Sequence, residues 1–128
     1  MTVQGQIHSR FKLFSGSLGA GGSLGKLATE VADFAKKAKA APKSIGIEYL
    51  EHSKEVVFSL GYRDDQPAYD IKIDSLSMGK VASLNATELS RVEKKMEEAA
   101  AKVKGLICHE LMVTDQNEFI LVFMTHVG

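Results

Sequence analysis

The chain ends in two apolar strands, Lys104-Gly105-Leu106-Ile107-Cys108-His109-Glu110-Leu111 and Phe119-Ile120-Leu121-Val122-Phe123. A weaker copy of this pair lies in the first half, as Lys43-Ser44-Ile45-Gly46-Ile47-Glu48-Tyr49-Leu50 and Val56-Val57-Phe58-Ser59-Leu60. Apolar residues align with apolar residues at most positions, which predicts an internal duplication. The main exception is Tyr49 in the first copy, which becomes Glu110 in the second and places an acid in an otherwise apolar strand.

Each copy predicts a strand-helix-strand-strand unit, at about residues 4–63 and 69–127 of one 128-residue domain. Alternating polar and apolar residues indicate first strands at 4–14 and 69–74, and the repeated pairs give hairpins across 45–62 and 105–127. Helices are expected from Ser23, as N-cap, to Pro42, and after Asn85, with Glu88 completing a capping box. The expected fold class is therefore α+β, with antiparallel sheets, both helices on one face, and the last strand central because it is apolar on both sides.

Composition excludes several partners. Sixteen basic residues balance sixteen acidic ones and the sequence pI is near 6.9, so the chain lacks the positive charge expected for nucleic-acid binding. Its longest apolar runs are too short to span a bilayer, and its first ten residues lack the apolar core of a signal peptide, so we expect a cytoplasmic protein without membrane contact. The single cysteine, Cys108, is expected to be a buried, inert thiol.

The sequence contains partial matches to cofactor-binding and catalytic motifs, but none of these motifs is complete. Ala20-Gly21-Gly22-Ser23-Leu24-Gly25-Lys26-Leu27 lies where a phosphate-binding loop would lie, but it has Leu27 in place of the metal-binding Ser or Thr. The four histidines have no metal-ligand spacing, and neighbouring Cys108 and His109 point to opposite faces of a strand. We therefore expect no cofactor, no metal and no nucleophilic catalysis.

Two interpretations of Glu110 stay open. By strand alternation it shares a face with Leu106, Cys108 and Met112, and it either reaches water or a lysine such as Lys72, or is held in an apolar cleft. A buried carboxylate costs several kcal/mol without a partner, and a lipophilic cation would compensate it. Aromatic faces would add about 0.5–2 kcal/mol for each cation–π contact. The expected ligand-binding residues are Glu110, Tyr49, Tyr62, Tyr69, Phe14 and Met112.

Three short sequence motifs within this strand-helix-strand-strand order carry a family resemblance: Gly22-Ser23-Leu24-Gly25, Ile45-Gly46-Ile47-Glu48-Tyr49 and His109-Glu110-Leu111-Met112-Val113-Thr114-Asp115. With the duplicated unit, they make the chain resemble the GyrI-like small-molecule-binding domains, which occur as gyrase-inhibitory proteins and as effector-binding domains of multidrug-responsive regulators. The resemblance implies a ligand pocket between the repeats, and it implies that Glu110, the acid of the third motif, faces this pocket.

The leading hypothesis is thus a non-catalytic domain that binds a lipophilic, cationic small molecule between its repeats. The alternative is a protein-interaction or homodimer-forming module, in which the outer face of the last strand packs on another chain together with Met78, Met112 and Met124. A third hypothesis is an enzyme that uses Glu110 as a general base, since some relatives of this fold are thought to hydrolyse small ligands.

Overall fold

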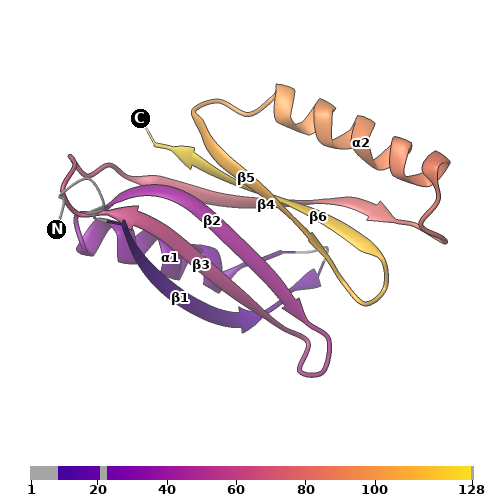
Figure 1. Cartoon of the computed structure of the whole chain (residues 1–128), viewed down its shortest axis with the longest axis horizontal. Coiled ribbons are helices and arrows are strands. Elements are labelled where there is room, and N and C mark those ends of the chain that lie inside the picture. Colours follow the sequence, from indigo (N-terminus) through magenta and orange to yellow (C-terminus); the bar gives the residue numbers. More distant parts are fainter. Residues whose placement is uncertain (1–8, 21–22, 128) are drawn as a thin grey trace, which may run out of the picture.

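A computed structural model describes residues 9–20 and 23–127 and shows an α+β fold, as the sequence predicts. Six strands and two helices follow one another as strand-helix-strand-strand, twice (Figure 1). The elements are β1 (Ser9–Ser17), α1 (Lys26–Lys37), β2 (Ala41–Leu50), β3 (Glu55–Arg63), β4 (Ile71–Lys80), α2 (Ala86–Ala101), β5 (Leu106–Val113) and β6 (Glu118–His126). The first five residues of the strand expected at 4–14 lie outside the described ranges.

Each repeat forms its own three-stranded antiparallel sheet. The strand order is β1-β3-β2 in the first, here called sheet A, and β4-β6-β5 in the second, sheet B. The last strand of each repeat is therefore central in its sheet, flanked by the other two. This identical topology is compatible with an internal duplication.

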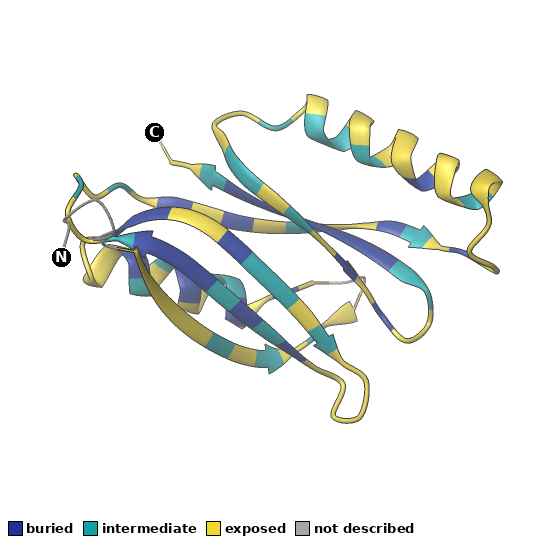
Figure 2. Cartoon of the chain, viewed as in Figure 1, coloured by how far each residue is buried: buried dark blue, intermediate teal, exposed yellow. Residues whose placement is uncertain are grey.

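The main core lies between the two sheets. It joins one face of sheet A, through Val56, Phe58 and Leu60, to one face of sheet B, through Ile120, Val122 and Met124. At one side β2 and β5 lie against each other, and at the other α1 contacts both β1 and β4. The sheets thus form a wedge that is joined along β2 and β5, with α1 closing its open side. Every residue from Phe119 to Met124 is buried, which confirms the central place predicted for the last strand (Figure 2).

The two helices cover equivalent faces of their own sheets. Residues Leu27, Val31 and Ala35 of α1 pack on the Phe58 side of sheet A, inside the main core. Helix α2 covers Phe119, Leu121 and Phe123, on the side of sheet B away from sheet A, and forms a second, smaller core (Figure 1). The helices therefore belong to different layers of the molecule.

Local signals explain most element ends. Asn85 caps α2, since its side-chain oxygen accepts a hydrogen bond from the Glu88 amide at 2.9 Å. The expected Ser23 cap of α1 is wrong: α1 starts at Lys26, and its N-cap is Gly25, whose φ of 51° suits glycine and which has no side chain to cap with. Pro42 follows the helix and lies within β2, where the pairing with β3 shifts between Pro42 and Ser44.

Helices α1 and α2 contain 12 and 16 residues, and across 9–20 and 23–127 no helix combines the length and apolarity that a membrane crossing needs.

Candidate functional site

The boundary between the repeats is the seam where β2 meets β5. The two strands belong to separate sheets, so side chains rather than a strand ladder hold this seam together. In its middle the Cys108 sulfur is hydrogen-bonded to the backbone of Ile45. Burial of the half-exposed Cys108 raises the pKa of its thiol, the direction expected of an unreactive cysteine. The predicted ligand site falls on this seam.

Glu110 lies on β5 at the middle of the seam and is partly buried. Its register partner on β6 is Val122, so it points to the same side of sheet B as the main core. Its neighbour on this face, Met112, is 2% exposed and is part of that core. The expected face of Glu110 is therefore correct, and the space beside it contains packed apolar side chains.

The other predicted ligand-binding residues are dispersed. Phe14 and Tyr62 lie on the α1 side of sheet A, where both rings make edge contacts with Phe34, with ring centres 5.8 and 5.4 Å apart. Tyr69 lies at the far end of the seam, where its hydroxyl donates to the Pro42 carbonyl and its ring stacks on His126. The structure thus brings neither Phe14, Tyr62 nor Tyr69 to Glu110. Only Tyr49 is part of a polar cluster shared by both repeats.

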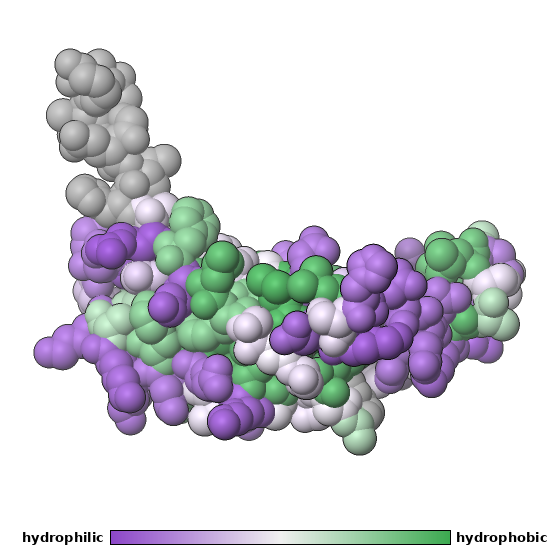
Figure 3. Space-filling view, turned by 90° about the horizontal axis from the view of Figure 1, so that it is seen from below, coloured by the Kyte–Doolittle hydropathy of each residue, from purple (hydrophilic) through white to green (hydrophobic). Residues whose placement is uncertain are grey.

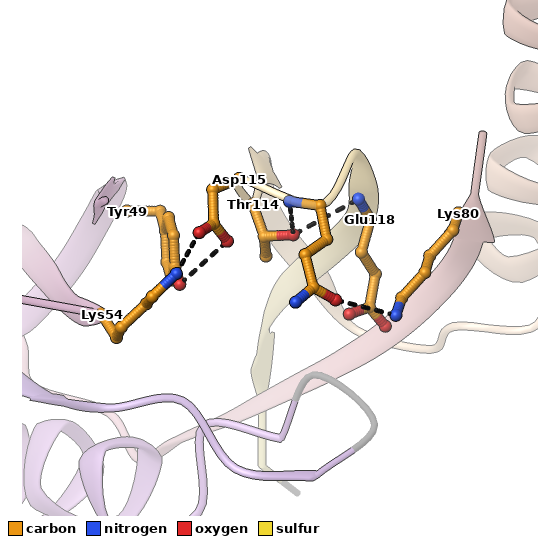
Figure 4. A network of polar contacts seen from close by, with 7 residues as sticks. Tyr49, Lys54, Lys80, Thr114, Asp115 and Glu118 are labelled. Carbon is orange, nitrogen blue, oxygen red and sulfur yellow. Dashed lines mark hydrogen bonds and ion pairs between the residues drawn. The ribbon is translucent and has the colours of Figure 1, made fainter. Parts of the chain in front are cut away.

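That cluster lies at the tips of the two hairpins (Figure 4). Tyr49 is the next-to-last residue of β2 in the first repeat, and its hydroxyl donates to Asp115 Oδ1 of the second repeat at 3.3 Å. Lys54, in the turn between β2 and β3, donates from its ammonium to the other oxygen of the same carboxylate. The Asp115 side chain is 16% exposed, whereas that of Lys54 is 62% exposed. Two groups of one repeat therefore hold a single acid of the other.

The contacts shift the pKa of each partner as their charges require. The hydrogen bond from Lys54 holds the pKa of the Asp115 carboxyl below its ordinary value, and the Tyr49 hydroxyl contributes to the same effect. The Lys54 pKa is raised by its hydrogen bond to Asp115. Desolvation and the nearby Asp115 charge raise the pKa of Tyr49, which remains a neutral hydrogen-bond donor at physiological pH.

A rigid turn presents Asp115. The Thr114 hydroxyl oxygen accepts hydrogen bonds from the amides of Gln116 and Glu118, each at 3.3 Å, and Asn117 takes the positive φ of 57° that closes the turn. Lys80 Nζ donates to the Gln116 side chain at 2.9 Å, which ties this turn to the end of β4. These contacts within the second repeat therefore fix the position of the Asp115 carboxylate on that repeat's side of the seam.

The cluster borders a small cleft of about 220 Å³ to which both repeats contribute. Its walls are Leu18, Tyr49, Lys54, Thr114, Asp115, Gln116 and Glu118. Two carboxylates and one ammonium line it, so the cleft carries an excess of one negative charge before any guest enters. Such a lining recognises a cation.

No protein-family model, curated protein or solved structure matches this chain.

Parts of the remaining motifs can be located in the structure. Leu27, the residue that replaces the metal-binding Ser or Thr of a phosphate-binding loop, is 3% exposed and packs in the main core. Within 9–20 and 23–127 no group of three or more His, Cys, Asp or Glu side chains is placed to hold a metal ion. Residues 21 and 22 of the glycine-rich stretch lie outside the described part.

Sequence reasoning missed Lys54 and Asp115 as site residues. Asp115 is the last residue of the third quoted motif, but it lies after the end of β5, so strand alternation could not predict which side of the sheet it faces. A signal was nevertheless present: Tyr49 lies next to the end of its strand, shortly before a turn, and Asp115 begins the turn that follows β5. Their contact spans 66 residues and depends on how the repeats dock.

Proposed function

We propose that this protein is a non-catalytic small-molecule-binding domain of the GyrI-like type, and that its ligand is a small amine held in the hairpin-tip cleft between the repeats. The observation that carries the proposal is Asp115, whose side chain is 16% exposed and whose carboxylate is contacted by Tyr49 and Lys54 of the other repeat. The sequence hypothesis placed one acid at the centre of an inter-repeat pocket. The geometry favours Asp115 over Glu110 for that position.

Lys54 suggests how the ligand would bind. Its ammonium occupies the place on Asp115 that a ligand ammonium would take, yet its side chain is 62% exposed and reaches the site from a turn. An exposed ion pair contributes little to stability, so displacing Lys54 into solvent costs little. The incoming amine would take over the charge-assisted hydrogen bond to Asp115 and lie beside the Tyr49 ring.

The volume of the cleft limits the ligand. At about 220 Å³ it lies below the range of about 300–1,000 Å³ of pockets that enclose drug-sized molecules. A primary amine with one small apolar group fits that space, with the apolar part toward Leu18 and the ammonium toward Asp115.

Calorimetry with benzylamine tests this function. We expect Lys54→Met to bind benzylamine about threefold to fivefold more tightly than the wild type, because an internal competitor worth no more than an exposed ion pair is gone, and Asp115→Asn to lose detectable binding. Lys80→Met is the matched control, since Lys80 contacts Gln116 of the same turn but not Asp115, and it should bind like the wild type. Benzyl alcohol, which is neutral, should bind none of the variants.

The same titration distinguishes the two acids. Under the proposal, Glu110→Gln keeps benzylamine affinity and leaves stability unchanged or higher, because removing a partly buried charge relieves a desolvation cost. Loss of binding in Glu110→Gln together with full binding in Asp115→Asn would move the site to the middle of the seam. If Lys54→Met binds no more tightly than the wild type, the competition at Asp115 is refuted and the proposal with it.

A further inference from the structure

The side of sheet A that faces away from α1 has no cover among the described residues. We call it the open face. Register places on it Phe11, Leu13 and Ser15 of β1, Val57, Ser59 and Gly61 of β3, and Ser44, Gly46, Glu48 and Leu50 of β2. Phe11 is 71% exposed and Leu13 is 67% exposed, more than any other large apolar residue of the described chain. In Figure 3 apolar residues gather in the middle of the molecular surface and again at its right-hand end.

The duplication indicates what kind of surface covers such a face. In the repeat alignment Val57, Ser59 and Gly61 correspond to Ile120, Val122 and Met124 of the second repeat. Those three residues are 0% exposed, because sheet A packs over them. The second repeat therefore packs both faces of its sheet, one on its helix and one on a neighbouring sheet. The first repeat has its helix but no neighbouring sheet on the open face.

The charges of the open face are separated along its strands. The central strand carries Val57, Ser59 and Gly61, with Glu48 of β2 beside Val57 and Glu55 at the start of β3. Arg63, which pairs with Asp65, lies at the opposite end. A second copy lying antiparallel on this face sets the acidic end of one copy over the Arg63 end of the other.

The shape of the open face complements itself. Phe11 and Leu13 extend from the edge strand, and the Phe11 ring reaches over Gly61, while Gly46 and Ser59 leave a lower floor beside Leu13. That floor is closely packed within the sheet, since a Cβ at Gly46 would approach Ser59 Oγ to 2.6 Å. A two-fold axis through the face would set the projecting side chains of one copy over the floor of the other, which is the geometry of an isologous interface.

We propose that two copies of this chain associate through their open faces, as a sheet-on-sheet dimer. Three strands of nine or ten residues span about 30 by 14 Å, from the rise per residue and the strand spacing. An interface of that size falls below the lower end of stable specific interfaces and in the range of weak, transient ones. The dimer therefore dissociates in the micromolar range. It places the hairpin-tip cleft of each copy outside the interface core.

Sedimentation velocity from about 5 to about 500 µM protein tests the dimer, since this range brackets a micromolar dissociation constant. The wild type should shift with concentration toward twice the 13.9 kDa mass of one chain. The double variant Phe11→Ser, Leu13→Ser should remain monomeric throughout. Leu84→Ser is the control: Leu84 is 64% exposed but lies before α2, and its variant should dimerise like the wild type. Circular dichroism checks that each variant keeps its fold.

A second variant separates face packing from edge pairing, because β1 is also an edge strand. Ser59 lies on the central strand, next to Gly46, so a lysine there has room in the monomer but blocks an opposing sheet. Ser59→Lys should abolish the dimer. A Ser59→Lys protein that still dimerises would show that the copies pair through their edge strands, and this would overturn the proposal. A wild type that stays monomeric at about 500 µM would overturn it as well. Asp115→Asn should dimerise normally, so the test stands apart from amine binding.

Discussion

Replacing Ile120 by Ala should destabilise the protein by about 3 kcal/mol. Ile120 is 0% exposed and lies in the core that joins the two sheets. The substitution removes three buried carbons, each contributing about 0.8 kcal/mol, and leaves a cavity that adds to the loss. For a chain of this length the melting temperature should fall by about 10 °C.

The repeat alignment supplies a matched control for that substitution. Val57 is the equivalent of Ile120 in the first repeat, but it lies half-buried on the open face, so Val57→Ala should cost about 1 kcal/mol or less. Urea unfolding followed by circular dichroism gives both free energies of unfolding at low protein concentration, where the monomer predominates. Equal costs for Ile120→Ala and Val57→Ala would show that sheet A does not cover sheet B, and the packing of the repeats described above would be wrong.

Two further predictions concern single interactions. Asn85→Ala should lower the free energy of unfolding by about 1 kcal/mol because the Glu88 amide loses its acceptor, whereas Ser23→Ala, which caps no helix, should change it by less than about 0.5 kcal/mol in the same urea titration. The lowered pKa of Asp115 means that its ion pair with Lys54 stabilises the fold above the unfolded pKa of about 3.9 and is lost as pH falls through the folded pKa. Wild type and Asp115→Asn should therefore differ in stability at pH 7 and converge near pH 2; a difference that persists in acid would contradict this assignment.

The sequence predicted those parts of the fold that local pattern controls. The run from Phe119 to Met124 is apolar at every position, and a strand buried on both faces must be central, as β6 is. Asn85 precedes an amphipathic stretch with Glu88 three residues on, and it caps α2. The alternation along β5 correctly placed Glu110 and Met112 on one face. For α2 and β5 the deciding pattern lies within one element, and for β6 the apolar run itself requires cover on both faces, whichever segments supply it.

Features that depend on docking of the repeats could not be predicted in this way. Phe14 and Tyr62 both point to the α1 side of sheet A. Strand alternation could not show that Phe34 of α1 would fill the space beside their rings. The same pattern cannot tell which face of one sheet meets the other sheet. Tyr49 and Asp115 come together only because β2 and β5 lie side by side, so the acid of the candidate site was sought on a strand and found in a turn.

The thin packing of α2 has a dynamic consequence. Only Val92 of its sixteen residues is fully buried, whereas α1 buries three of its twelve between the sheets. Local opening costs least where few apolar contacts are broken, so α2 can detach while both sheets stay intact. Its backbone amides should exchange with deuterium well before those of α1 and β6. The chain then has a separable outer layer, and the stable unit that remains is the wedge of two sheets closed by the first helix.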